Sequence, residues 1–502
     1  MKVLIANRGE IAVRIGRACR ELGLGTVAVY SDCDRSALHV RLADEAHHIG
    51  ASPAGESYLR IDRLVDVARR TGATFVHPGY GFLAENEAFA QACADAGLTF
   101  VGPRPEVIAL MGSKTAARAA AIRAGVPVVP GTDTPFDAGT ADAVIAAEAG
   151  RIGYPLVVKA VAGGGGKGMR VVAAPEALAG AVRTARSEAQ SAFGDARIYL
   201  ERRLIAPRHI EIQLLGDGHG TVLPFVEREC SIQRRHQKVV EESPSPVLDE
   251  ATREAMADCA ARVARGVGYT NAGTIEFLLD ADRAFYFLEM NTRLQVEHPV
   301  TEMVAGIDLV HWQLRIARGE PLTIDPARAL TPRGHAIECR IYAEDPDRNF
   351  MPAPGLVRSI STPAGPGVRD DRGVAAGFEV PVFYDSMISK LVVWGGTRPE
   401  AVARLARALD EYRIAGVTTT IPFFKWLVRQ PEFTSGRFDT TYLDRLLAGR
   451  GGQRFVEPDA RDLDDAAAAV ALVSWLRARG AAAAPAPDGG AWRRAARLDG
   501  VQ

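Results

Sequence analysis

The first hundred residues alternate between short apolar runs and amphipathic segments, and this alternation constrains the fold more than any other feature. The pattern predicts strands at residues 3–6, 26–30, 74–77 and 98–101, and helices at 11–22, 57–70 and 85–96. Strands that alternate with helices are typical of a parallel sheet. The first turn, residues 7–10, lacks the G-x-G-x-x-G pattern. A dinucleotide-binding domain is therefore disfavoured, although the layout is Rossmann-like.

Length and composition bound the remaining possibilities. A chain of 502 residues is too long for one core, so we expect two to four domains. Its 47% hydrophobic and 24% charged residues are typical of a soluble globular protein, and its net charge of −1 argues against nucleic-acid and membrane-surface binding. No apolar run reaches spanning length, and Arg8 and Glu10 follow too soon for a signal peptide. The six cysteines lie far apart, which predicts reduced thiols in the cytoplasm and no zinc motif.

A glycine run at residues 163–168 lies between two predicted strands. The pattern G-x-G-x-x-G is weak evidence alone, but residues 169–172 read as a strand and not as a helix. A strand–glycine loop–strand unit indicates a hairpin flap over phosphate groups, with Lys159 and Lys167 supplying positive charge. The run lacks the Gly-Lys-Ser/Thr of a Walker A motif. A flexible surface hairpin is the alternative.

Lysine is scarce in this chain. Of the 60 basic residues only seven are lysine, namely Lys2, Lys114, Lys159, Lys167, Lys238, Lys390 and Lys425. Against such a bias, a lysine is expected where a site needs a compact ammonium group that a planar guanidinium cannot replace. For any single lysine, the alternative is that it was retained by chance and has no special role.

Residues 287–299 carry an alternating polar pattern. If this stretch is extended, side chains two residues apart share one face, and the polar set is Glu289, Asn291, Arg293, Gln295 and Glu297. Two carboxylates and an amide can hold a hard cation, and an arginine offers a fork for an oxyanion. The alternative is an ordinary exposed strand face.

Other predicted strands add polar groups. Residues 208–214 alternate as a half-buried strand does, and residues 230–242 are dense in cations beside two carboxylates. Glu276 stands alone in an apolar strand, which implies a metal or cation partner. From residue 332 onward the chain reads as a separate mixed domain with strands at 334–343, 355–360 and 382–393 and a helix at 399–412. A linker at 449–452, an alanine-rich helix at 463–479 and a disordered stretch at 481–490 complete the chain.

Together these strings resemble the biotin carboxylase component of biotin-dependent carboxylases, an ATP-grasp enzyme. The resemblance covers about residues 1–447. It rests on IANRGEIAVRI (5–15), HPGYGFLAEN (77–86), GGGGKGM (163–169), RHIEIQ (208–213), CSIQRRHQKVVEESPSP (230–246), NAGTIEFL (271–278), EMNTRLQVEHPVTE (289–302), ECRIYAED (338–345) and YDSMISKL (384–391). Motifs of this length in this order are specific, whereas GGGGKG alone is not.

The resemblance implies an α/β (α+β) fold with four segments. These are an N-terminal Rossmann-like domain at 1–112, an ATP-grasp domain at 113–330 with its flap at about 131–203, a C-terminal mixed α+β domain at 331–447, and a tail at 448–502. It further implies ATP-dependent carboxylation of biotin with bicarbonate through carboxyphosphate, as the first half-reaction of an acetyl-CoA or acyl-CoA carboxylase in fatty acid biosynthesis. ATP and Mg²⁺ or Mn²⁺ are the implied cofactors.

The resemblance also implies roles for matching residues. Lys114 and Lys159 would bind phosphates, with Gly165 and Gly166 in the flap. The implied adenine and ribose contacts are Glu201, Arg202, Arg203, Leu204, His209, Gln233 and His236, and the implied metal ligands are Glu276, Glu289 and Asn291. The implied bicarbonate cradle is Lys238, Arg293, Gln295, Val296 and Glu297, with Glu297 as the base. Tyr80 and Arg340 would contact the biotin ureido ring, with Lys238, Arg293, Glu297 and Arg340 as the catalytic set. Arg17 and Glu21 match a homodimer contact.

The sequence departs from the family pattern at two positions and lacks two features of complete biotin-dependent carboxylases. Arg202 stands where the family often has lysine, and Ala162 stands where glycine is common. No Met-Lys-Met-like biotin attachment string and no carboxyltransferase domain occur, so biotin is expected on a separate carrier protein beside a carboxyltransferase subunit. We hypothesise that residues 463–498 dock a partner subunit. The alternatives are the biotin carboxylase component of a two-subunit pyruvate carboxylase, another ATP-grasp ligase such as a carbamoyl-phosphate-type enzyme, and a non-catalytic nucleotide-binding relative. The final acceptor is left open.

Overall fold

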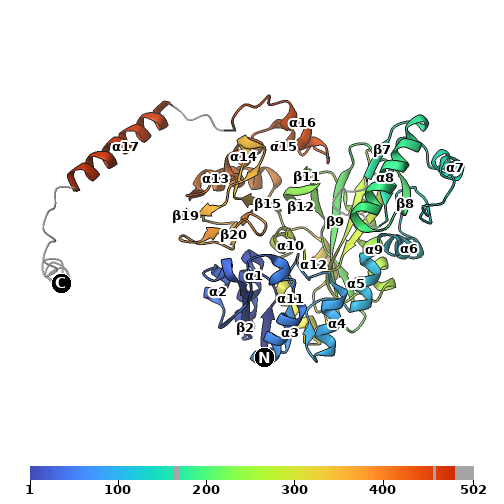
Figure 1. Ribbon diagram of the computed structural model, residues 1–502, viewed down its shortest axis with the longest axis horizontal. Coiled ribbons are helices and arrows are strands. Elements are labelled where there is room, and N and C mark those ends of the chain that lie inside the picture. The colour runs from blue at the N-terminus through green and yellow to red at the C-terminus, as the bar shows by residue number, and fades with distance from the viewer. Residues whose placement is uncertain (162–168, 456–459, 481–502) are drawn as a thin grey trace. The chain divides into compact units, whose positions relative to one another are not determined.

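The computed structural model describes residues 1–161, 169–455 and 460–480 (Figure 1). The chain divides into a compact unit over Met1–Gln453 and a second unit over Arg454–Gln502. Among the described residues, none of the helices combines the length and the apolar character that crossing a membrane requires.

The N-terminal segment forms the predicted parallel sheet, with strand order β3-β2-β1-β4-β5. Its strands are β1 (Lys2–Ile5), β2 (Gly25–Ser31), β3 (Glu45–Gly50), β4 (Phe75–His77) and β5 (Thr99–Phe100). Its helices are α1 (Gly9–Glu21), α2 (Leu38–Leu42), α3 (Ile61–Thr71), α4 (Glu87–Asp95) and α5 (Pro105–Gly112). Strand β3 was not predicted, because its sequence EAHHIG has little apolar content. The start of α3 was predicted four residues early, because residues 57–59 form a turn before the helix begins.

A small antiparallel sheet, β7-β6-β8, follows in the chain (Figure 1). It consists of β6 (Leu156–Ala160), β7 (Met169–Val172) and β8 (Ile198–Arg202), with α6 (Lys114–Arg123) and α7 (Asp142–Ile152) before it and α8 (Leu178–Phe193) packed on β6 and β7. The strands β6 and β7 pair antiparallel from Leu156 to Lys159, which confirms the predicted hairpin strands. The glycines of the predicted flap, Gly165 and Gly166 included, lie outside the described residues.

The largest sheet has nine strands in the described chain, in the order β14-β13-β9-β11-β12-β15-β22-β20 with β10 on β9. The strands are β9 (Arg208–Gly216), β10 (Val222–Pro224), β11 (Arg228–Arg234), β12 (Gln237–Ser243), β13 (Asn271–Leu279), β14 (Phe285–Asn291), β15 (His335–Tyr342), β20 (Val368–Arg372) and β22 (Met387–Gly395). Helices α9 (Glu250–Gly266), α10 (His298–Ala305), α11 (Leu309–Ala317) and α12 (Pro326–Leu330) belong to the same region. Because β12 pairs with β15, this sheet runs without a break into the segment that was predicted to be a separate domain.

Two strand predictions were wrong in ways that affect the site. Residues 208–214 are not half-buried, because β9 lies between β13 and β11 and nearly every side chain on it is buried on either face. Residues 287–297 are not one extended strand, because β14 ends at Asn291 and a loop leads to α10. The polar residues after Asn291 therefore reach the site from a loop.

The C-terminal part of the first unit combines short strands and helices. It contains β16 (Glu344–Asp345), β17 (Met351–Pro352), β18 (Gly355–Leu356), β19 (Ser359–Ser361), β21 (Glu379–Val380), β23 (Arg413–Ala415), α13 (Arg398–Glu411), α14 (Ile421–Leu427), α15 (Pro431–Thr434) and α16 (Tyr442–Ala448). The strand predicted at 355–360 is split into β18 and β19, and β22 begins five residues after its predicted start.

The second unit contains the helix α17 (Ala460–Gly480), which confirms the predicted alanine-rich helix. Within it Val470, Val473 and Leu476 are exposed. The disordered stretch predicted at 481–490 and the part of the predicted docking segment after residue 480 lie outside the described residues.

Candidate active site

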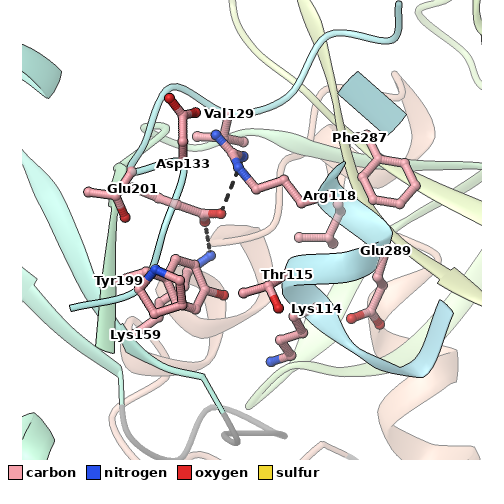
Figure 2. A pocket seen from close by; sticks show the side chains of 13 residues that line it. Lys114, Thr115, Arg118, Val129, Asp133, Lys159, Tyr199, Glu201, Phe287 and Glu289 are labelled. Carbon is pink, nitrogen blue, oxygen red and sulfur yellow. Dashed lines mark hydrogen bonds and ion pairs between the residues drawn. The ribbon is translucent and has the colours of Figure 1, made fainter. Parts of the chain in front are cut away.

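Two lysines and two of the three carboxylates that line one pocket come from four different elements (Figure 2). Lys114 begins α6, Lys159 lies on β6, Glu201 on β8 and Glu289 on β14. Lys159 pairs with Glu201, whose other oxygen lies 3.7 Å from Nη1 of Arg118. Burial lowers the pKa of Lys114, Glu289 raises it and the like charge of Lys159 lowers it further, with a net fall. A pocket in which two ammonium groups repel each other favours an anion such as a phosphate chain.

Three carboxylates stand side by side across adjacent strands. Glu276 on β13 is directly opposite Glu289 on β14 and also opposite Glu211 on β9. Directly opposed side chains have Cβ atoms about 5 Å apart, so these groups share one patch. Burial, followed by the negative charge of Glu276, raises the pKa of Glu289. Such repulsion is relieved by a cation that bridges the two groups.

The immediate partners of Glu276 are nitrogen donors. Its Oε2 lies 3.0 Å from Nε2 of His209, and Asn291 Nδ2 donates to its Oε1 at 2.9 Å. His209 is buried and its Nδ1 lies 2.9 Å from Nε2 of Gln233. The oxygens of Glu276, Glu289 and Asn291 form a donor set suited to Mg²⁺ or Mn²⁺, so these residues fit the implied metal.

Lys238 is the centre of the buried polar cluster. Its Nζ donates to Glu211 at 2.6 Å, to Glu276 at 2.8 Å and to Glu297 at 2.7 Å. It also lies 3.3 Å from Oε1 of Gln295. Burial opposes the charge of Lys238, but the three carboxylates outweigh burial and raise its pKa well above the ordinary range. Lys238 therefore stays cationic at any working pH.

Glu297 is held between two cations. One oxygen accepts from Lys238 and the other accepts from Nη2 of Arg340 at 2.9 Å. Burial would raise the pKa of Glu297, but Lys238, Arg340 and Arg228 lower it far below the ordinary value. Arg340 also donates through Nε to Glu241 at 2.6 Å. The carboxylate of Glu297 is consequently ionised, which a proton acceptor must be.

The loop after β14 adds Arg293, Gln295 and Val296. Arg293 donates to Glu85 at 2.7 Å and to Oδ1 of Asn291 at 3.0 Å. Gln295 is buried and donates to Glu276 at 2.9 Å. The loop thus brings side chains to the carboxylate patch although it is not a strand.

A cavity of about 440 Å³ opens beside Arg340 and is lined by Tyr80, Arg293, Val296, Tyr342 and Tyr384 among others. The hydroxyl oxygen of Tyr80 is buried and has no hydrogen-bond partner among the described residues. An aromatic wall with an unsatisfied hydroxyl and a guanidinium fits a small, flat ligand that carries a carbonyl oxygen.

Several residues with predicted roles stand apart from this cluster. His236 is exposed at the turn between β11 and β12, with φ of 68°. Arg202 reaches Tyr286 at 3.3 Å, Arg203 is exposed and Leu204 is half-buried. Arg17 and Glu21 are exposed on α1. Their predicted roles remain predictions.

Sequence reasoning missed four members of the cluster. Arg228 is fully buried, pairs with Glu211 and donates to Thr301 and Gln213 at 2.9 Å each. Glu211, Glu241 and Glu85 serve as partners of Lys238, Arg340 and Arg293. The available signal was an acid inside an apolar strand, as for Glu211, but the pairing of β9 with β11 and β13 was needed to identify its partners.

Comparisons with known proteins give matches that together cover most of the chain. Family models match at residues 1–108 (biotin carboxylase, N-terminal domain), 113–325 (carbamoyl-phosphate synthase L chain, ATP binding domain) and 338–445 (biotin carboxylase C-terminal domain). The chain is 51% identical over 449 residues to one of the subunits of pyruvate carboxylase from Methanothermobacter thermautotrophicus, and the match covers 89% of this chain and 90% of that protein. It is 50% identical over 445 residues to the biotin carboxylase of Nostoc sp., covering 89% and 99%.

The chain belongs to the biotin carboxylase family. Members of this family are ligases that carboxylate biotin with the use of ATP. The fold agrees with the biotin carboxylase domain dimer of Hydrogenobacter thermophilus 2-oxoglutarate carboxylase, solved with MgADP, ADP and bicarbonate. That structure has a TM-score of 0.85 and 45% identity, and covers 91% of this chain and 99% of its own. This likeness confirms the predicted α/β fold with a parallel N-terminal sheet, an ATP-grasp region and a C-terminal domain.

Proposed function

We propose that this biotin carboxylase uses ATP and bicarbonate to carboxylate biotin carried on a separate protein, through carboxyphosphate, at the buried cluster around Lys238. The observation that carries the proposal is Glu297, whose carboxylate lies between Lys238 at 2.7 Å and Arg340 at 2.9 Å. Bicarbonate activation needs an ionised base beside cations that hold the anion, and these residues supply both.

The nucleotide belongs in the pocket of Figure 2. There Lys114 and Lys159 offset the charge of the β- and γ-phosphates. Gln233 and His209 lie further along the sheet, where ribose contacts are expected. A bound Mg²⁺ or Mn²⁺ on Glu276, Glu289 and Asn291 would neutralise charge on the transferring phosphoryl group.

The residues of the cluster divide the chemistry between them. Lys238 and Arg293 bind the bicarbonate anion, and Glu297 accepts its proton. A bicarbonate oxygen then forms a bond to the γ-phosphorus of ATP as the bond to ADP breaks, giving carboxyphosphate. Carboxyphosphate yields CO₂ and phosphate next to biotin. The released phosphate takes the proton of the ureido N–H, Arg340 stabilises the negative charge that this leaves on the ureido oxygen, and the ring nitrogen then forms a bond to the carbon of CO₂. Tyr80 forms the wall against which that ring lies.

The oligomeric state, the cellular location and the partner proteins are also proposals. We infer a homodimer through the exposed face of α1 that carries Arg17 and Glu21, a cytoplasmic location, and two partners, namely a biotin carrier protein and a carboxyltransferase subunit. We retain the division at residues 112, 330 and 447 and the remaining residue roles as predictions. Acetyl-CoA or another acyl-CoA is the first candidate for the final acceptor, which a carboxyltransferase subunit would select. Pyruvate is the second candidate, because a relative at 51% identity belongs to a pyruvate carboxylase.

The test measures ATP hydrolysis by the purified chain with and without bicarbonate and free biotin. We expect hydrolysis to require bicarbonate and to rise when biotin is added, with labelled carboxybiotin formed from labelled bicarbonate. A rate of ATP hydrolysis that depends on bicarbonate but does not change when biotin is added would favour a carbamoyl-phosphate-type ligase. Nucleotide binding without any hydrolysis would favour a non-catalytic relative.

A further inference from the structure

Lys390 has no role in the chemistry described above, yet it is completely buried. It lies on β22 with 0% of its surface exposed, in a chain that has seven lysines among 60 basic residues. A buried ammonium group is costly unless each donor finds an acceptor.

The partners of Lys390 lead to the active-site loop. Its Nζ donates to the backbone carbonyl of Val296 at 2.9 Å and lies 3.2 Å from Oε1 of Glu10 on α1. It also lies 5.8 Å from the centre of the Tyr80 ring. Val296 is the residue before Glu297, in the loop between the end of β14 and the start of α10.

The sheet register pairs this lysine with the catalytic arginine. Lys390 and Arg340 stand directly opposite each other in the antiparallel pair β22–β15, so their side chains share a face. Arg340 holds the carboxylate of Glu297, and Lys390 holds the carbonyl of Val296. The two neighbouring cations Arg340 and Lys390 therefore bind two consecutive residues, Glu297 and Val296.

The charge around Lys390 is balanced by carboxyl groups. Glu10 lies on one side, Asp371 is opposite Lys390 in the β20–β22 register, and Glu338 lies on β15. Both oxygens of Glu338 and of Glu10 are buried without a hydrogen bond among the described residues. The compact ammonium is the cation next to Glu10, whereas Asp371 also pairs with Arg369 at 2.6 Å. The planar fork of arginine would need more room than the ammonium group of Lys390.

We propose that Lys390 is a positioning residue of the carboxylation site, which fixes the backbone at Val296 so that Glu297 stays between Lys238 and Arg340. This inference rests on the proposed function, in which Glu297 is the base. Lys390 touches no reacting atom. It acts through the loop, and through Glu10 it ties that loop to the N-terminal sheet region.

The first experiment compares Lys390→Met with Lys425→Met in the full chain. Lys425 lies on α14, where it pairs with Asp410 at 3.3 Å and is not part of the site. Displacement of a catalytic group by about 1 Å costs on the order of 100-fold in rate, so we expect a fall of that size in biotin-dependent kcat for Lys390→Met. The KM for ATP and the Kd for ADP should change less than about threefold, because Lys114 and Lys159 are unaffected.

A second variant separates positioning from folding. Lys390→Met alone leaves the carboxylate of Glu10 without its cation, and the double variant Lys390→Met/Glu10→Gln removes both charges. We expect the double variant to regain thermal stability and not kcat. Recovery of kcat together with stability would overturn the proposal, as would unchanged kcat in folded Lys390→Met or a parallel loss of ADP affinity. Failure of the wild-type chain to form carboxybiotin would instead refute the proposed function.

Discussion

At the scale of single residues, Glu297 depends on its neighbours for its chemistry. Burial alone would favour the neutral acid, but Lys238, Arg340 and Arg228 lower its pKa far below the ordinary value. Glu241 accepts from the same Arg340 and is buried as well, and its pKa is raised to about 7 by burial and by Glu297. The arrangement therefore keeps Glu297 ionised, and Lys238 and His209 do the same for Glu276, whereas the pKa of Glu241 is raised.

Replacement of Glu297 by Gln keeps the shape of the side chain and removes the proton acceptor. We expect kcat for biotin-dependent ATP hydrolysis to fall by about 100-fold or more, the usual contribution of a positioned base. The KM for ATP should stay nearly constant. Glu254→Gln on the exposed face of α9 is the matched control. Steady-state kinetics check this, and unchanged turnover in Glu297→Gln would show that another group accepts the proton.

Glu10 gives stability a pH dependence. Burial raises its pKa from 4.5 to about 7, so the folded state binds its proton more tightly than the unfolded state. Its contribution to stability is full below about pH 4.5 and is lost as the pH rises through about 7. Glu10→Gln lacks this slope, so its stability relative to wild type should rise by up to about 3 kcal/mol between about pH 5 and about pH 8. Urea unfolding of both proteins at the two pH values checks this, with Glu254→Gln as control; a constant difference would contradict it.

At the scale of elements, the predictions succeeded where periodicity is local. The alternation of strands and helices predicted the parallel sheet, and two strands around a glycine run predicted the β6–β7 hairpin. The predictions failed where the burial of a strand, or the residue at which it ends, depends on the strands beside it. Nothing in residues 208–214 shows that both faces of β9 are covered, and nothing in residues 287–297 shows that β14 stops at Asn291.

The same distinction holds for the site. The stretch that contains Glu289, Asn291, Gln295 and Glu297 was recognised from its residue types. The structure brings Gln295 and Glu297 to Lys238, and Asn291 to Glu276, which itself contacts Lys238. Their convergence was attributed to strand alternation, which holds for Glu289 and Asn291 on β14, whereas Gln295 and Glu297 reach the site from the loop after β14. Buried partners such as Arg228 stayed hidden because long-range pairing, and not sequence spacing, places them.

The helix α17 has no assigned role in catalysis. The family models end at residue 445, and Met1–Gln453 is a compact unit by itself. We expect a chain that ends at Gln453 to keep its kcat and melting temperature, and to lose capture of the carrier or transferase subunit. Pull-down of those subunits checks this, with Val473→Lys/Leu476→Lys in the full chain as the matched disruption of the exposed apolar residues. Equal capture by all forms would reject partner docking by the tail.

At the scale of the whole molecule, buried ion pairs connect segments that are distant in the sequence. Glu302 on α10 accepts from Arg14 of α1 at 2.9 Å and from Arg369 of β20 at 2.7 Å. Lys390 of β22 and Glu10 of α1 form a similar link. One face of α1 is thus committed to the interior of the molecule, and the opposite face, with Arg17 and Glu21, is exposed.

The exposed face of α1 makes the proposed homodimer testable by charge reversal. Arg17 and Glu21 are four residues apart and share one side of the helix, so a two-fold contact would bring opposite charges together. Arg17→Glu and Glu21→Arg should each weaken the dimer by at least about tenfold, since like charges then meet across the interface, and the double exchange should restore it. Arg41→Glu on α2 is the control for a change of charge at another exposed site. Sedimentation velocity over a range of concentrations checks this. A dimer that is indifferent to both single changes would place the interface on another face, and a wild-type chain that sediments as a monomer would remove the interface altogether.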